Sequence, residues 1–246
     1  MVESFLNLPL AGLWKGFLDS NLVGIVIVVI QVALSVVAGA IIIGKFKELN
    51  TVGRGNKRFM REFTNGRDVL EYYLNRKTQR QSVSLELMYV KTCERMVKLI
   101  DPLTRSRAIK DADARDAVAL TGKEIALLRG NCEHIAEDEE IRLDKGMTML
   151  AFIVTTAPML GLLGTVWGVL DAFDLMGGKG TVLLSEIAPA ISSALVTTVV
   201  GLMVAIPASG GYNWLSGKMR EITSDMDGFI DELLGRIARE YQGRDD

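Results

Sequence analysis

Three long apolar stretches stand out along this chain of 246 residues. They cover residues 22–44, 148–173 and 187–209, and the first contains no charged side chain. A helix that crosses a bilayer needs about 20 predominantly apolar residues at a rise of about 1.5 Å per residue. Each stretch is long enough, so the pattern predicts three transmembrane helices.

Apolar residues also recur at helical spacing outside these stretches. Residues 112–145 alternate apolar and charged faces and reach the second stretch without a proline, so we expect one helix to continue into the membrane. Residues 215–242 should extend the third stretch in the same way. Residues 3–18 favour an amphipathic surface helix, and a short segment packed on the first span is the alternative. Together these patterns predict an all-α protein with three transmembrane helices, two of them extended into the cytoplasm.

Basic residues are strongly segregated, and this sets the expected orientation. The segment between the first two apolar stretches holds 21 of the 28 Lys and Arg residues. Basic residues close to the ends of a span keep that end on the cytoplasmic side of a membrane. Lys45 and Lys47 directly follow the first span, and Arg142 and Lys145 directly precede the second. We therefore expect the N-terminus outside and the middle segment and C-terminus in the cytoplasm. A mean hydropathy of +0.25 agrees with a membrane protein that has a polar part.

Small residues recur every three or four positions on the second and third apolar stretches. Gly161, Gly164 and Gly168 form such a stripe on the second, and Ala194 and Gly201 belong to one on the third. Stripes of this kind let helix backbones approach closely in lipid, where apolar burial does not drive association. We interpret these five residues as helix-packing positions.

Hydroxyl side chains lie at membrane depth on the same two stretches. Thr165 is eight residues before Phe173 and Thr198 is 11 residues after Ile187, so their depths differ by about 4–5 Å. Ser193 and Thr197 lie one turn apart nearby. Polar groups at this depth are costly and mark either helix contacts or an ion path. The residues alone leave both open, because a hydroxyl can also bond to a carbonyl of its own helix.

No titratable side chain lies at mid-depth in the three stretches. Asp171, Asp174 and Glu186 flank the short connection between the second and third stretches, where either a solvated surface role or an ion-gathering role fits them. Hydroxyls do not titrate near neutral pH. An ion path that performs work would therefore need a carboxylate from another chain.

The remaining polar residues give no pattern typical of an enzyme. Cys93 and Cys132 share no metal-ligand spacing with His134, so we interpret them as reduced thiols and expect no metal site. The acidic run 137–140 is typical of a solvated helix face. No nucleophile–base pair, phosphate loop or cofactor motif is evident, and charges of mixed sign give no nucleic-acid signature. We therefore expect no catalytic residues and no cofactor.

Two runs of sequence resemble helices of a known family. APMLGLLGTVWGVLDAF at Ala157–Phe173 closely resembles the second membrane helix of the MotA/TolQ/ExbB proton-channel family, and Ala188–Ala208 resembles the third. The three spans favour the ExbB/TolQ branch, because the flagellar MotA branch has four. By this resemblance Thr165 and Thr198 correspond to the family's two pore threonines. Ser193 stands where the best-studied ExbB and TolQ proteins carry a membrane glutamate.

The resemblance implies an ion-channel (stator) subunit of a motor in the bacterial inner membrane. It implies a homopentamer around a dimer of a single-span ExbD/TolR-like partner, whose membrane Asp faces the threonines. A TonB/TolA-like protein and membrane lipids are further expected partners. Such a motor uses the proton motive force to power envelope work such as TonB-dependent transport. Ser193 and Thr197 add oxygen ligands, so a Na⁺-driven motor of the same family is one alternative. The other alternative is a non-conducting membrane scaffold, in which the hydroxyls only hold the helices together.

The inner-membrane location and the expected orientation assign every part of the chain to the membrane or to one side of it. Its parts are a periplasmic amphipathic N-terminal segment at 1–21, transmembrane helix 1 at 22–44, a cytoplasmic helical domain at 45–147, transmembrane helix 2 at 148–173, a periplasmic loop at 174–186, transmembrane helix 3 at 187–209 and a cytoplasmic C-terminal helix at 210–246.

Overall fold

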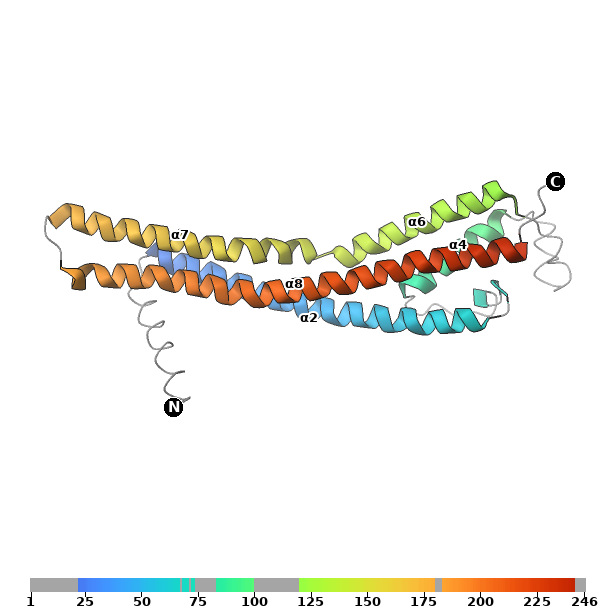
Figure 1. Ribbon diagram of the computed structural model, residues 1–246, viewed down its shortest axis with the longest axis horizontal. Helices are drawn as coiled ribbons and strands as arrows, with labels where there is room; N and C mark the ends of the chain where they lie inside the picture. The colour runs from blue at the N-terminus through green and yellow to red at the C-terminus, as the bar shows by residue number, and fades with distance from the viewer. Residues whose placement is uncertain are drawn as a thin grey trace, which may run out of the picture. The chain divides into compact units, whose positions relative to one another are not determined.

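The computed structural model describes residues 22–66, 68–70, 72–73, 83–99, 120–179 and 183–241. Its elements are the helices α2 (Leu22–Asn65), α4 (Ser84–Leu99), α6 (Gly122–Asp144), α7 (Met147–Lys179) and α8 (Leu184–Tyr241), and these residues contain no strand (Figure 1). Three of the helices, α2, α7 and α8, are long and apolar enough to cross a membrane. The prediction of an all-α fold with three transmembrane helices is confirmed. The amphipathic segment expected at 3–18 lies outside the described residues.

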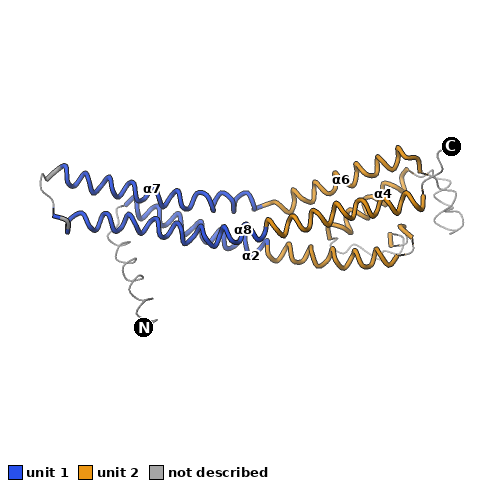
Figure 2. The backbone as a smooth tube through the Cα atoms, in the orientation of Figure 1, with its two compact units in different colours: residues 1–45, 146–215 blue, residues 46–145, 216–246 orange. Residues whose placement is uncertain are grey.

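The helices divide between two compact units (Figure 2). Unit 1 consists of residues 1–45 and 146–215, and unit 2 of residues 46–145 and 216–246. Both α2 and α8 contribute residues to the two units without interruption. The first and third apolar helices are therefore the ones that continue into unit 2.

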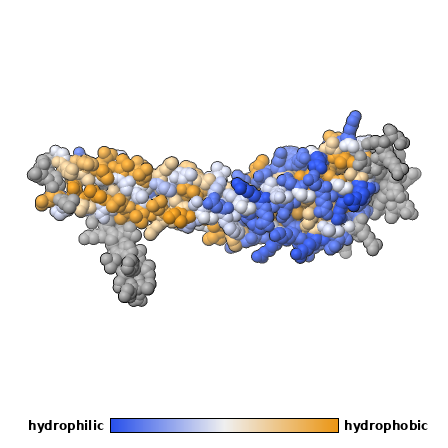
Figure 3. Space-filling view, viewed as in Figure 1, coloured by the Kyte–Doolittle hydropathy of each residue, from blue (hydrophilic) through white to orange (hydrophobic). Residues whose placement is uncertain are grey.

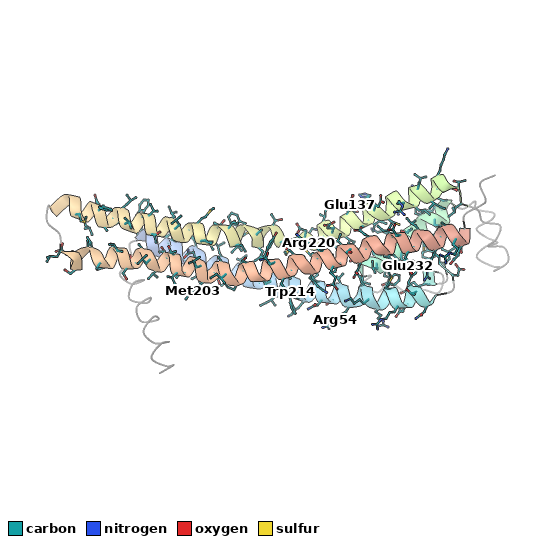
Figure 4. The ribbon with its side chains drawn as sticks, viewed as in Figure 1. Arg54, Glu137, Met203, Trp214, Arg220 and Glu232 are labelled. Atoms are coloured by element: carbon teal, nitrogen blue, oxygen red, sulfur yellow. The ribbon has the colours of Figure 1, made fainter. Side chains whose placement is uncertain are left out.

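Unit 1 presents an apolar surface. Only 22%, 28% and 33% of the most apolar stretches of α2, α7 and α8 are buried. The visible face of unit 1 is mainly hydrophobic, whereas that of unit 2 is mainly hydrophilic (Figure 3). Met203 projects from α8 away from the neighbouring helices and is 61% exposed (Figure 4). An apolar surface of this extent needs lipid or another protein copy to cover it.

The second apolar helix begins at a break, which corrects the expectation of one helix running from 112–145 into the membrane. That expectation was wrong because α6 ends at Asp144 and α7 begins at Met147. Lys145 has an extended ψ of 124°, and Gly146 has a φ of +89°. Only glycine adopts this left-handed conformation readily, and glycine just past a basic last turn is a common helix ending. A helix does not need a proline to end.

Unit 2 is built on an aromatic core shared by α2, α4 and α8. The Phe63 and Phe229 rings lie 5.1 Å apart in an edge-on arrangement, and Phe59 lies 5.6 Å from Tyr89. The Tyr89 hydroxyl donates to the Val69 carbonyl and accepts from the Tyr73 N–H at 3.1 Å. Each aromatic pair adds about 0.5–1.5 kcal/mol beyond its buried area. This core accounts for the helical continuation of α2 beyond its apolar stretch.

Both cysteines lie inside this core and are fully buried. Burial raises the pKa of the Cys93 thiol to about 12, and it also raises the pKa of Cys132. The thiols therefore stay protonated at neutral pH, and a protonated buried thiol is a poor nucleophile.

Candidate functional site

In unit 1, α7 and α8 approach each other closely along a stripe of small residues. A Cβ atom placed on Gly168 would lie 2.6 Å from the Ala194 Cβ, and one placed on Gly161 would lie 2.9 Å from the backbone of α8. A Cβ on Gly164 would overlap the hydroxyl of Thr197. Real Cβ contacts are not this short, so any larger residue at these positions would push the helices apart.

A buried glutamine joins the third helix to this pair. Gln31 of α2 is 0% exposed, and its Nε2 donates to the carbonyls of Ala157 on α7 and Thr197 on α8, both at 3.2 Å. A Cβ on Gly201 would lie 2.8 Å from this Nε2, so the glycine leaves room for the amide. Sequence reasoning did not select Gln31. The available signal was one amide within an apolar stretch that has no charged residue.

The hydroxyls of Thr197 and Thr198 bind α8 to α7. Thr198 donates to the Gly161 carbonyl at 2.9 Å. The single hydroxyl hydrogen of Thr197 is shared between the Gly161 carbonyl at 3.2 Å and the Ala194 carbonyl of its own helix at 2.7 Å. A hydroxyl that donates to a carbonyl still has lone pairs on its oxygen. These oxygens can therefore accept a hydrogen bond from water or coordinate a cation.

Thr165 and Ser193 make a different kind of contact. Thr165 donates to the Leu162 carbonyl at 2.7 Å, and Ser193 donates to the Ala190 carbonyl at 2.9 Å, each within its own helix. Among the described residues no hydrogen bond joins Thr165 to Thr198. Thr198 thus connects two helices, Thr165 and Ser193 bond back to their own helix, and Thr197 does both.

A pocket of about 240 Å³ lies beside this junction, between α2, α7 and α8. Its polar walls are formed by Asp171 of α7 and by Glu186, Ser193 and Thr197 of α8. Gly164 and Gly168 also line it, so the close helix contact forms its inner wall. The pocket brings two of the hydroxyls together with two carboxylates.

The three acidic residues near this end of unit 1 all lie on helices, because α7 continues to Lys179 and α8 begins at Leu184. Asp174 is exposed and does not line the pocket. Asp171 lines the pocket, and its Oδ2 is buried without a hydrogen-bond partner among the described residues. Within the same residues, no group of three or more His, Cys, Asp or Glu side chains is placed to hold a metal ion.

These features define a class, namely an all-α multi-pass membrane protein in which two spans pack tightly around buried hydroxyls. The sequence profile of the MotA/TolQ/ExbB proton channel family matches residues 104–228. The Tol-Pal system protein TolQ of Haemophilus influenzae is 30% identical over 232 residues, which cover 93% of this chain and 94% of that protein. The chain belongs to the MotA/TolQ/ExbB proton channel family.

Two further relatives match a shorter part of the chain. The biopolymer transport protein ExbB of Neisseria gonorrhoeae is 42% identical over 99 residues, 40% of this chain and 45% of that protein. The ExbB of Aquifex aeolicus is 44% identical over 82 residues, 33% of this chain and 55% of that protein. These relatives confirm the assignment to the ExbB/TolQ branch. With three apolar helices, they support a multi-pass protein of the inner membrane whose relatives are channel and transport components.

We predict that Gly164→Ala weakens the packing of α7 on α8, because the new methyl group would overlap the Thr197 hydroxyl. Overpacking of this kind costs about 1–3 kcal/mol. Gly210→Ala is the matched control, since a Cβ there meets nothing within 4 Å. Circular dichroism of the detergent-solubilised protein should show a lower melting temperature for Gly164→Ala only. Equal melting temperatures for the two variants would show that the helices are not closely packed at Gly164.

Proposed function

We propose that this chain is the ion-channel (stator) subunit of an ExbB/TolQ-like motor that uses the proton motive force for envelope work such as TonB-dependent transport. The observation that carries the proposal is the junction at Gly161, where the hydroxyls of Thr197 and Thr198 meet one carbonyl inside an apolar helix pair. Intramembrane polar groups either hold helices together or line an ion path, and the proposal takes the second role for these hydroxyls. In the proposal Thr165, Thr198, Ser193 and Thr197 line the path.

The proposed path needs a titratable group that this chain does not carry at the depth of the threonines. A dimer of a single-span ExbD/TolR-like protein would supply a membrane Asp, surrounded by five copies of this chain. A TonB/TolA-like protein would receive the resulting motion. The energy scale is adequate, since one charge moving through 100 mV releases about 2.3 kcal/mol.

The hydroxyl geometry also favours a second candidate, a Na⁺-driven motor of the same family. A proton passes along hydroxyls only where each one donates a bond and accepts another. Thr165, Ser193, Thr197 and Thr198 all donate to backbone carbonyls, so their free lone pairs suit a cation that prefers oxygen ligands. A non-conducting scaffold is the alternative in which these bonds serve only to hold helices together.

Removing one hydroxyl at a time distinguishes a channel from a scaffold. Thr165→Val and Thr198→Val keep the side-chain shape, and each lost hydrogen bond in a membrane costs on average only about 0.6 kcal/mol. We therefore expect normal assembly and loss of motor-dependent growth or uptake in a complemented deletion strain. Thr155→Val is the control, because Thr155 donates to carbonyls of its own helix, as Thr165 does, but is not one of the four residues of the proposed path. If both test variants function normally at normal expression, the channel proposal fails and the non-conducting scaffold is the remaining explanation.

The proposed stoichiometry has its own measurement. Close packing through Gly161, Gly164 and Gly168 is expected to leave the apolar outer faces of unit 1 for contacts between copies. Native mass spectrometry of the protein in mild detergent should show a pentamer, heavier by two partner chains after co-expression. A stable monomer under these conditions would contradict the channel proposal.

We propose a periplasmic N-terminus and a cytoplasmic C-terminus, because Lys45 and Lys47 directly follow the first span and Arg142 and Lys145 directly precede the second. Cysteine labelling in intact spheroplasts tests this orientation. The native thiols Cys93 and Cys132 are fully buried and would stay unlabelled on either side, so a cysteine-free background is needed. In it, Lys179→Cys should react with a membrane-impermeant maleimide, whereas Lys123→Cys, at an exposed position of α6, should react only after lysis. The opposite pattern would reverse the topology.

A further inference from the structure

The proposed ion path makes no use of Asp171, although this residue continues the stripe of small residues on α7. Gly161, Gly164, Gly168 and Asp171 follow one another at spacings of three, four and three, which places them on one helix face. The first three of these positions face α8 closely. The stripe that packs against α8 therefore ends in a carboxylate.

The facing surface of α8 ends in the same way. Counted toward the start of α8, Thr197, Ala194 and Ala190 repeat at spacings of three and four, and Glu186 follows four residues further. Glu186 is exposed, whereas Thr197 is 1% exposed. The pocket between these surfaces therefore begins at an exposed carboxylate and ends at a buried hydroxyl.

Asp171 is half-buried as a residue, and one of its two carboxylate oxygens is shielded from solvent. Its Oδ2 is buried with no hydrogen-bond partner among the described residues. No Lys, Arg or His is among the described residues that line the pocket. A buried carboxylate oxygen is costly unless it is bonded, protonated or paired with a cation. Asp174, one turn away and exposed, faces no such requirement.

The other polar atoms of the pocket are oxygens with free lone pairs. Ser193 and Thr197 donate their hydroxyl hydrogens to the carbonyls of Ala190 and Ala194, at 2.9 and 2.7 Å. Their oxygens can therefore coordinate a cation without breaking these bonds. A volume of about 240 Å³ also leaves room for several waters of about 30 Å³ each.

We propose that this pocket is a binding site for a small monovalent cation, Na⁺, held by the Asp171 carboxylate. The oxygens of Ser193 and Thr197 are its neutral ligands, and Glu186 lies at the exposed end of the pocket. The role of the site in ion access rests on the proposed channel function, whereas cation binding itself does not.

A covalent probe tests binding without requiring ion flow. Dicyclohexylcarbodiimide is an apolar reagent that adds to a protonated carboxyl, and transfer of the acyl group to nitrogen then gives a stable N-acylurea with no leaving group. The detergent-solubilised full chain is treated with it at several pH values, in NaCl or in choline chloride at equal ionic strength. Mass spectrometry of the peptides then gives the extent of labelling at Asp171 and at Asp174, the matched control on the same helix.

Each outcome decides the proposal. Labelling of Asp171 above Asp174 that falls in NaCl but not in choline chloride supports the site with Na⁺ as the cation. Labelling above Asp174 that ignores NaCl overturns the proposal, because the reaction of a protonated carboxyl then explains it without a bound cation. Labelling of Asp171 no greater than that of Asp174 overturns the proposal, because Asp171 is then an ordinary surface carboxylate. In the Na⁺ case, Ser193→Ala should raise the half-protecting NaCl concentration several-fold, and an unchanged value would overturn its role as a ligand.

A second experiment separates this site from the motor. In cells, Asp171→Asn should abolish motor-dependent growth or uptake, Asp171→Glu should retain part of it, and Asp174→Asn should leave it unchanged. If Asp171 is labelled as expected but the wild-type chain supports no ion-driven work, the site stands and the proposed function fails. If the wild-type chain functions and Asp171→Asn is as active as Asp174→Asn, the role of the site in ion access is overturned.

Discussion

The polar features of unit 1 depend on the close approach of α7 to α8. Thr197 and Thr198 reach the Gly161 carbonyl only because Gly161 and Gly164 carry no side chain at the contact. In lipid the hydrophobic effect does not drive helix association, so dispersion contacts and interhelical hydrogen bonds must hold the helices together. A larger residue in the stripe would lengthen every one of these bonds at once. The small residues and the hydroxyls are therefore one feature of the structure.

Gln31 extends this constraint to α2. Its Nε2 donates to carbonyls of both α7 and α8, and Gly201 keeps the space that the amide occupies. An amide buried in an apolar environment is costly without partners, so Gln31 specifies one position of α2 along the helix pair. In unit 2, packed aromatic rings such as Phe63 and Phe229 hold the helices together instead, as the hydrophobic effect favours for a unit with a hydrophilic surface (Figure 3).

Much of this architecture follows from sequence periodicity, because apolar length and small-residue spacing depend on chain neighbours alone. The three spans and the stripe through Gly164 could be predicted on that basis. The ending at Gly146 could not, since a glycine is tolerated inside many helices and only its φ of +89° distinguishes a break. Sequence position gives the depth of Thr165 and Thr198 but not which carbonyl each hydroxyl meets. That choice depends on rotamers and on the facing helix.

The same limit explains why Asp171 and Asp174 looked equivalent in the sequence. They lie three residues apart at nearly one depth, so their difference is a matter of helix face. Asp171 lies in line with Gly164 and Gly168, toward α8, while Asp174 is exposed. Asp171 lies near the end of α7, so its carboxylate avoids the full cost of burial at the middle of the membrane. It nevertheless lines the same pocket as the hydroxyls of Ser193 and Thr197. In the proposed channel, whose mid-depth hydroxyls do not titrate, Asp171 is the position from which the chain's own charge would act on an approaching cation.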